Sequence, residues 1–495
     1  MRFIIVNILL LIPVLSFSQQ TFFKYYPSIE YEEVYCVAED DFKNFYMCGV
    51  KYISLPGGSN SGYILKTDSA GNLVDEFTSF SQVKNSGFTS IFYTDTISNS
   101  LIVVGNEDSI TSTGSINRIT VLKLSTEMVI NSKSLFSFGE QIQNLPQESL
   151  ILNDSIIYIV SWVFTQLDPA IHLSVLKVGL PSDSLGYFIS PFSGKQTSSD
   201  IIFNNLDTTL LISYGGSLFK GGGLTKVIKF DTDLNYISGF EPDLFLMNTS
   251  GLCNYTDTSY LITSTTITPA LNYQHMVTCE YSYDNNLVNY IEITAGNPDT
   301  LSFCSGAKNT LFKDSLIWTV GIYNAIPAYY PWQQEPSWIQ LNCINSAFEL
   351  IEQHFYGGDA FYVPFDMKAT GDGGIIIVGS RYDYNAIPQL FQKDPFVLKV
   401  NSEGLIVNVN NPEKPIAQEA IVLPNPGSEY LQVKLAIQHK TAHFQLFDIN
   451  GRLVLEENLQ GDMQRVSTSS LNSGTYIYRI TASNRVIGSG KWVKD

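Results

Sequence analysis

Short apolar runs that end at a small residue recur along most of the chain. One example is Leu101-Ile-Val-Val-Gly105. Equivalent runs end at Gly49, Gly105, Ser161, Gly215, Ser264, Gly321 and Gly379. The 330 residues from the first to the last of these hold six intervals, an average of 55 residues. A continuous apolar run of this length, bounded by turn residues, is typical of a strand covered on both faces.

A second marker keeps the same period. It is a strand that carries a polar residue, usually lysine, after two or more apolar residues, as in Tyr63-Ile-Leu-Lys-Thr-Asp68. It recurs around Lys123, Lys177, Lys229, Glu280, Gln340 and Lys399. Turn sequences such as Asp68-Ser-Ala-Gly71 then lead into a further strand, with glycine supplying the positive φ of the last turn position. The two markers predict seven units of four short strands each.

A four-stranded unit of this size cannot bury both of its faces alone, so the units must stack on one another. For antiparallel four-stranded sheets the closed solution is a β-propeller. We therefore predict an all-β fold with a seven-bladed β-propeller over residues 19–411. The segment Thr21–Tyr26 resembles an outermost strand and is expected to close the ring by pairing into the last blade.

The pattern changes near the C-terminus. Residues 412–420 form a short Pro-containing linker, and residues 421–495 contain strands with alternating apolar and polar positions, such as Tyr430–Leu435. Pro-Asn-Pro, Asn-Gly and Ser-Gly turns separate them. These signals predict a small Ig-like β-sandwich.

The order and spacing of four blocks in this region resemble the type A C-terminal sorting domain of the type IX secretion system of Bacteroidetes. The matching residues are Pro424, Asn425, Pro426, Asp448, Gly451, Arg452, Leu471, Gly474, Tyr476, Lys491 and Lys494. The resemblance implies that the type IX machinery acts on residues 421–495, exports the chain across the outer membrane and usually removes this domain. The alternative is an ordinary Ig-like or fibronectin-like adhesion module. The last two repeat units also resemble a repeat of secreted Bacteroidetes propellers.

The N-terminus predicts export as well. Arg2 precedes an apolar run, Phe3 to Leu15, that is too short to span a bilayer, and the small residues Ser16 and Ser18 follow it. Residues 1–18 are therefore expected to be a signal peptide; a hydrophobic first strand would alternate, and this run does not. We expect no transmembrane segment in the mature chain, and a secreted or outer-membrane cell-surface protein that passes through the periplasm.

Charge and cysteine content narrow the chemistry. The net charge of −18 repels phosphate backbones, so no nucleic-acid partner is expected. Cys36 and Cys48 flank a turn that places them opposite each other on one hairpin, which makes them a disulfide candidate. The connectivity of the other four cysteines stays open. There is no Cys-x-x-Cys pair, so neither a metal site nor a cofactor is expected.

Motifs for catalysis are missing from the sequence. It contains no Gly-x-Ser-x-Gly, His-Glu-x-x-His or phosphate-loop pattern, so no catalytic residue is assigned. Asp231-Thr-Asp-Leu-Asn235 has the first ligand spacing of a calcium loop, but Tyr236 stands where that loop needs glycine. We interpret this stretch as a turn. The recurrent lysines are expected to lie between blades, with their stems packed and their ammonium groups solvated or paired with acids.

Aromatic residues in loops after the second strands of the last two units are the best binding candidates. They are Tyr323, Tyr329, Tyr330, Trp332, Tyr382 and Tyr384. Exposed Tyr and Trp can stack on sugars or pack on a protein; the alternative is that these rings only cover a blade edge. The expected function is a non-enzymatic protein that binds a glycan or protein ligand. The alternatives are a glycan-processing enzyme with paired carboxylates in a central channel, and a purely structural or adhesive component.

Overall fold

The computed structural model covers most of the chain after the predicted signal peptide. The described residues are 19–52, 59–79, 85–94, 99–111, 114–139, 142–165, 171–180, 183–189, 197–215, 224–242, 244, 246–268, 273–293, 302–303, 308–326, 332–386, 392–407, 420–435, 442–449, 451–461, 463–482 and 485–495. The predicted signal peptide 1–18 and nearly all of the predicted linker lie outside these residues.

The strands described between residues 22 and 400 form seven antiparallel sheets, six of which are built only from strands that follow one another in the chain. The first sheet is β2 (Tyr31–Glu39), β3 (Phe45–Tyr52), β4 (Asn60–Thr67) and β5 (Leu73–Thr78). The second is β6 (Ser86–Thr94), β7 (Ser100–Thr111), β8 (Gly114–Ser125) and β9 (Ile130–Phe136). The third is β10 (Ile142–Leu152), β11 (Ile156–Thr165), β12 (His172–Gly179) and β13 (Asp183–Ile189).

The remaining four sheets of this part repeat the pattern. The fourth is β14 (Thr197–Asn204), β15 (Thr209–Gly215), β16 (Lys226–Asp231) and β17 (Tyr236–Phe240). The fifth is β18 (Leu246–Thr256), β19 (Ser259–Thr268), β20 (Tyr273–Ser282) and β21 (Leu287–Ile293). The sixth is β22 (Ser302–Phe303), β23 (Thr310–Lys313), β24 (Leu316–Tyr323), β25 (Trp338–Ile344) and β26 (Leu350–Gly357). The seventh is β27 (Phe361–Ala369), β28 (Ile375–Tyr382) and β29 (Asp394–Val400), completed by β1 (Phe22–Tyr25).

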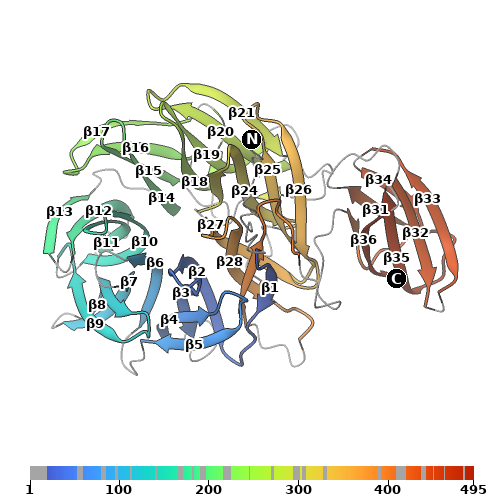
Figure 1. Cartoon of the computed structure of the whole chain (residues 1–495), viewed down its shortest axis with the longest axis horizontal. Helices are drawn as coiled ribbons and strands as arrows, with labels where there is room; N and C mark the ends of the chain where they lie inside the picture. The colour runs from blue at the N-terminus through green and yellow to red at the C-terminus, as the bar shows by residue number, and fades with distance from the viewer. Residues whose placement is uncertain are drawn as a thin grey trace, which may run out of the picture.

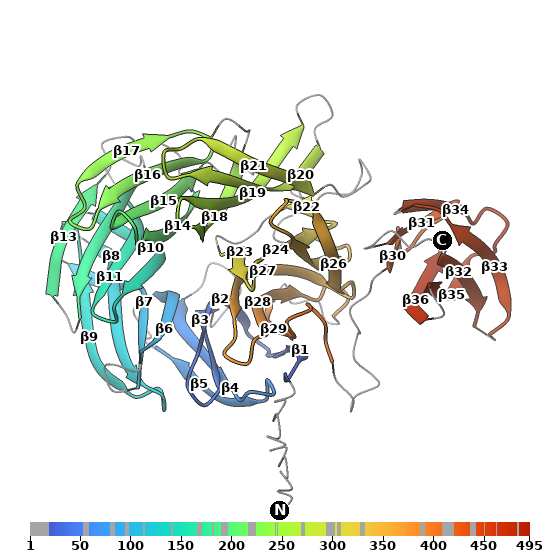
Figure 2. The same cartoon turned by 45° about the horizontal axis from the view of Figure 1, so that its top comes forward.

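The two ends of this region meet in the seventh sheet. β1 pairs with β29 from Phe22 opposite Lys399 to Tyr25 opposite Phe396, and so becomes the outermost strand. The predicted closing role of Thr21–Tyr26 is thereby confirmed. The first strand of each sheet contacts the first strand of the next, with β23 in this role in the sixth sheet, and β27 contacts β2. The sheets therefore follow one another around a common centre (Figure 1), as the tilted view also shows (Figure 2).

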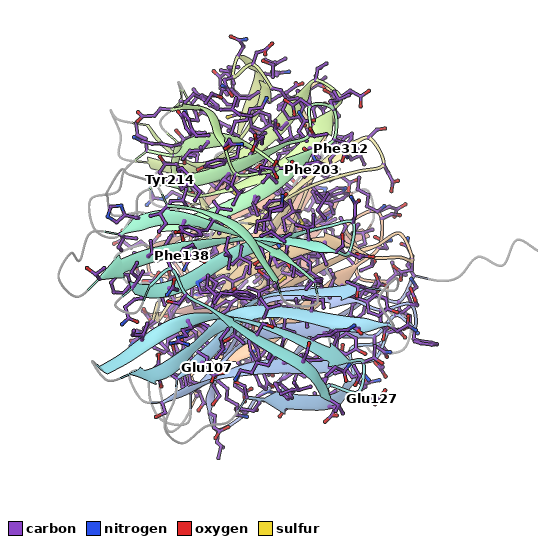
Figure 3. The ribbon with its side chains drawn as sticks, turned by 90° about the vertical axis from the view of Figure 1, so that its left-hand side faces the viewer. Glu107, Glu127, Phe138, Phe203, Tyr214 and Phe312 are labelled. Carbon is purple, nitrogen blue, oxygen red and sulfur yellow. The ribbon has the colours of Figure 1, made fainter. Side chains whose placement is uncertain are left out.

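The hydrophobic core of the ring is divided into layers between neighbouring sheets. Leu101 and Val103 pack with residues of the first sheet, whereas Ile102 and Val104 pack with residues of the third. Successive side chains of a strand point to opposite faces, so both faces of each sheet are covered. This explains why the runs that set the sequence period are continuously apolar. Phe138, Phe203 and Phe312, which Figure 3 labels, pack in these layers between adjacent sheets.

The glycine that ends several of these runs also has a structural cause. The first strands of the first, second and seventh sheets contain a β-bulge opposite it. At the bulge, the main-chain oxygen before it turns toward the second strand. A Cβ at Gly49, Gly105 or Gly379 would lie 1.8, 2.0 or 2.1 Å from that oxygen. Only glycine fits there without a backbone shift.

The C-terminal region has two sheets around a separate core that includes Trp492. One is formed by β30 (Ala420–Leu423), β31 (Tyr430–Leu435) and β34 (Met463–Ser467). The other is formed by β33 (Leu453–Leu459), β32 (Ala442–Asp448), β35 (Gly474–Ala482) and β36 (Arg485–Lys494). The described part of the chain contains no α-helix, and so none that could cross a membrane. The predicted all-β fold is confirmed.

Candidate functional site

The aromatic side chains proposed from the sequence fall into three groups. Tyr323 is 0% exposed and Tyr382 is 1% exposed, so neither ring is offered to a ligand, contrary to the expectation for them. Trp332 and Tyr384 are half-buried and pack on the cluster that contains Tyr382. Tyr329 and Tyr330 lie outside the described residues. The structure therefore brings Trp332, Tyr382 and Tyr384 together. Of these, Trp332 also contacts other parts of the candidate site.

Trp332 is the centre of an aromatic group drawn from distant parts of the chain. Its ring lies 5.8 Å from that of Tyr31 and 5.0 Å from that of Tyr382, both edge to face. Tyr31 in turn contacts Tyr52, with 4.8 Å between ring centroids. Tyr31 begins β2, Tyr52 ends β3, and Trp332 lies between β24 and β25. All are therefore on the side of the ring where first strands begin and second strands end, which we call the loop face.

A buried ion pair supports this aromatic group. The Lys393 ammonium lies 2.6 Å from Glu33 Oε1, and it sits over the rings of both Tyr31 and Trp332 at 5.8 and 5.5 Å. The Tyr35 hydroxyl donates a hydrogen bond to Glu33 Oε2 at 2.9 Å. Burial alone would raise the pKa of Glu33, but the charge and hydrogen bond of Lys393 overcome this and lower it. The ion pair therefore stays charged and fixes the rings above it.

Sequence reasoning missed Tyr31, Tyr52, Glu33 and Lys393 as members of this site. Tyr31 and Trp332 are about 300 residues apart in the chain, and they meet only because the ring closes. The available signal was positional. Aromatic residues at the start of a first strand and at the end of a second strand border the same loops as Trp332.

The β-bulges of the first strands place further side chains at the ring centre. Tyr35, Thr89, Gln147 and Phe365 are the extra residues of four bulges, and each is half-buried between fully buried neighbours. The rings of Tyr35 and Phe365 meet edge to face at 5.2 Å, joining the first and seventh sheets. A bulge re-aims one side chain out of the strand's alternation, which is how these strands present residues to the ring centre.

Charged side chains also gather at the centre. Lys308 Nζ lies 2.8 Å from Glu148 Oε1, and Lys368 Nζ lies 3.5 Å from Asp366 Oδ2. Burial alone would lower the pKa of Lys308, but the charge of Glu148 outweighs it and raises that pKa. These residues come from different first-strand regions of the ring and were not identifiable as neighbours from the sequence.

The central carboxylates join neighbouring sheets. Asp366 Oδ2 accepts a hydrogen bond from the Val37 main-chain N–H at 2.9 Å. Asp200 Oδ2 accepts one from the Leu252 N–H at 2.7 Å, and its other oxygen accepts from Ile201 N–H. The bonds from Val37 and Leu252 each run from one first strand to the next, whereas the bond from Ile201 stays within β14. These acids therefore connect the sheets of the ring, because a buried carboxylate that accepts main-chain N–H groups satisfies both partners.

Asp200 has an unusual protonation equilibrium. Burial raises its pKa to about 8, and the charge of Glu148 adds to the rise. Lys308 and the two N–H donors act in the opposite sense. An acid with a raised pKa beside a second carboxyl group is an arrangement that many glycosidases use. In this site, however, both oxygens of Asp200 are already occupied by main-chain donors.

Cys36 and Cys48 lie directly opposite each other on β2 and β3. Both thiols are buried, and no disulfide joins them in the structure. A hydrogen bond from Cys48 lowers the pKa of Cys36 to about 7, against the effect of burial, and the charge of Lys368 adds to the decrease. Lys368 Nζ lies 3.5 Å from Cys36 Sγ. The register that the disulfide candidate requires is present, and the disulfide itself stays a prediction.

The stretch with calcium-like spacing is the turn between β16 and β17. Asp231 Oδ1 accepts hydrogen bonds from the main-chain N–H groups of Asp233 and Asn235 at 2.9 and 2.8 Å. Its other oxygen accepts from the Asn235 side chain. Both carboxylate oxygens of Asp231 thus accept hydrogen bonds within the turn. The interpretation of this stretch as a turn is confirmed. Among the described residues, no group of three or more His, Cys, Asp or Glu side chains is arranged to hold a metal ion.

The recurrent lysines lie where the sequence predicts. Lys177 of the third sheet pairs with Asp233 of the fourth at 2.9 Å, and its ammonium sits 6.0 Å from the Tyr158 ring centroid. Lys66 likewise pairs across sheets with Glu127 at 3.6 Å. Lys229 and Lys399 pair with acids of their own sheets. These four lysines are therefore paired with acids of the ring.

The motif residues of the C-terminal region hold its fold together. Asn425 donates a hydrogen bond to the Lys491 carbonyl and accepts one from the Val493 N–H, while the Trp492 indole donates to the Pro424 carbonyl. The Pro424-Asn-Pro426 block therefore attaches the start of the domain to its last strand. The Lys494 ammonium donates to two main-chain carbonyls, those of Ser428 and Thr468.

The other motif blocks form turns. Asp448 accepts a hydrogen bond from the Arg452 N–H, and Gly451 between them has φ of 79°. The turn from Leu471 to Gly474 is closed by the Tyr476 hydroxyl, which donates to the Asn472 carbonyl at 2.7 Å. These roles explain why such residue types stand at these places in the domain.

Residues 421–494 match the family described as the secretion system C-terminal sorting domain. The tail is a type IX sorting domain. Its two sheets and its four motif blocks agree with the resemblance found in the sequence. The family match covers the tail alone and assigns nothing to the ring. A comparison of the whole chain with curated proteins found no match.

Solved structures of low similarity match a larger part of the chain. The extracellular domain of a protein described as a hybrid two-component system from B. thetaiotaomicron has 11% sequence identity and a TM-score of 0.44. That match covers 96% of this chain but only 57% of that one. The β-propeller domain of the Trilobed protease from Pyrococcus furiosus has 10% identity and a TM-score of 0.42, covering 79% of this chain and 99% of that one. Similarities at this level carry no argument about activity.

Proposed function

We propose that this protein is an exported seven-bladed β-propeller, followed by an Ig-like sorting domain, that binds a glycan on the loop face of the ring. The type IX machinery delivers it to the cell surface or the medium by acting on residues 421–495. The observation that supports the binding role is the half-buried group of Tyr31, Tyr52 and Trp332 above the buried Lys393–Glu33 ion pair.

The chemistry of this group suits a sugar. Aromatic rings contribute large apolar surfaces that stack on the C–H faces of sugars, and fixed polar groups beside them can receive the hydroxyls. Lys51, which precedes Tyr52 in β3 and pairs with the partly exposed Glu30 at 2.7 Å, provides such a group. The net charge of −18 disfavours polyanionic glycans, so a neutral polysaccharide is the expected class.

Binding of neutral oligosaccharides to the mature protein tests this proposal, first on a glycan array and then by calorimetry. Trp332→Ala is expected to weaken binding about tenfold, because the loss of one stacking ring costs roughly 1.5 kcal/mol. Tyr290→Ala is the matched control, since Tyr290 is an exposed tyrosine on the outer strand β21. Equal binding by both variants would place the site elsewhere. Binding of a protein, with no glycan bound on the array, would show that the ligand is a protein and not a glycan.

A glycan-processing enzyme is the second candidate, favoured by the raised pKa of Asp200 beside Glu148. Against it stand the main-chain N–H donors that occupy both oxygens of Asp200. Incubation with the bound oligosaccharide followed by an assay for new reducing ends distinguishes the two. We expect unchanged oligosaccharide. Release of reducing ends that Asp200→Asn abolishes, in a variant that remains folded, would establish the enzyme.

A further inference from the structure

The sorting domain is packed against the sixth sheet of the ring. Ile421 and Leu423 of β30 form one buried cluster with Tyr323, Trp338 and Phe355, which come from β24, β25 and β26. Both cartoons place the tail beside the sixth sheet (Figures 1 and 2). The burial of Tyr323, which removed it from the candidate ligand site, is therefore explained by the tail.

Strand β30 contacts both the core of the sorting domain and the ring. All four of its residues are buried, whereas β32 and β35 of the same domain alternate between buried and more exposed positions. Ala420 and Val422 face the core of the sorting domain, and Ile421 and Leu423 face the ring. A strand that is apolar on both faces must be covered on both faces.

A lysine completes the contact. Lys434 lies opposite Ile421 on β31 and is only 4% exposed. Its ammonium sits 4.7 Å from the ring centroid of Tyr323 and 5.7 Å from that of Phe355. A cation held over two rings away from water interacts with them more strongly than a solvated one. The contact is therefore specific as well as apolar.

The position on the ring is equally specific. Alternation along β24 points Tyr323 to the same side as Ile317, and Ile317 packs against the fifth sheet. The fifth sheet thus covers this face of β24 at Ile317, and the tail covers the same face at Tyr323. Trp338 is backed by the main chain at Gly358, where a Cβ would lie 2.3 Å from the indole nitrogen. The Trp338 indole is therefore held against the main chain of its own sheet.

We propose that Tyr323, Trp338 and Phe355 form an intramolecular docking patch for the Ile421–Leu423–Lys434 face of the sorting domain, and that this contact keeps the two parts associated after the linker is cut. Buried Trp and Tyr side chains surrounded by apolar contacts are the usual centres of stable interfaces. Removal of the tail, which the sorting family implies, then requires dissociation from the patch in addition to proteolysis.

The test uses the mature full-length chain with a site for a sequence-specific protease inserted between residues 412 and 419. After cleavage, the ring and the tail are expected to elute together in gel filtration at about 10 µM, a concentration at which a micromolar interface stays occupied. Separation of the wild-type fragments at this concentration would overturn the proposal.

Tail-side variants test which residues hold the contact without disturbing the ring. Lys434→Ala is expected to weaken association about tenfold, as is Ile421→Ala, from the loss of a desolvated cation–π contact or a buried side chain. Ile477→Ala is the control, because Ile477 is 46% exposed on β35, in the other sheet. Thermal unfolding of the isolated tail fragment verifies that each variant is folded. Association that is insensitive to Lys434→Ala and Ile421→Ala alike would refute the assignment of the patch.

Discussion

Replacement of Gly105 by alanine tests why a glycine ends the second strand. A Cβ at this position would lie 2.0 Å from the Gly87 carbonyl oxygen, whereas real Cβ contacts stay beyond 3.0 Å, so a main-chain shift of about 1 Å is required. Overpacking of this kind costs roughly 1–3 kcal/mol, and a disturbed bulge hydrogen bond about 1 kcal/mol more. Replacing a glycine by alanine within a strand stabilises the folded state by only about 0.5–1 kcal/mol, because less backbone entropy is lost on folding. The net expectation is a loss of about 2 kcal/mol in the free energy of unfolding.

Gly186 offers a matched control on the outer strand β13, because a Cβ there would meet no atom within 4 Å. Gly186→Ala is expected to change the unfolding free energy by less than about 0.5 kcal/mol or to stabilise slightly. The assay is equilibrium denaturation of the mature protein by urea, with both variants and wild type measured side by side. If Gly105→Ala lies within about 0.5 kcal/mol of Gly186→Ala, the steric account of the repeated glycine is wrong.

Four further outcomes are expected. Leu234→Gly relieves a positive φ of 65° worth about 1 kcal/mol but removes a buried side chain worth about 2–5 kcal/mol, so urea denaturation should show net destabilisation. Burial raises the pKa of Asp394 to about 6, so its contribution to stability is complete below about pH 4 and is lost as the pH rises through 6; Asp394→Asn should lack that decline in pH-dependent unfolding. Truncation at residue 420 should leave a folded ring in the periplasm, and its appearance in the medium at normal yield, judged by immunoblot, would contradict the role of the tail. Alkylation followed by mass spectrometry of the exported protein should find Cys36 and Cys48 protected as a disulfide; full modification of both would show free thiols.

Much of the architecture was accessible from the sequence because its causes are local. The 55-residue period and the turn at Asp231 follow from strand alternation and turn chemistry within one unit. The motif blocks of the tail are equally local. One signal was available and missed: Ala420-Ile-Val-Leu423 is continuously apolar in a domain of alternating strands, which indicates a second covered face.

The sequence by itself therefore determined the strands, their repeat and the destination of the chain. Only the tertiary structure decided which aromatic residues are half-buried on the loop face and which are fully covered. Tyr323 is buried by a tail about 100 residues away, while Trp332 meets Tyr31 across the closure of the ring. The reason is physical. Strand periodicity fixes which face a side chain occupies, but the partner of that face depends on how non-neighbouring sheets and domains pack.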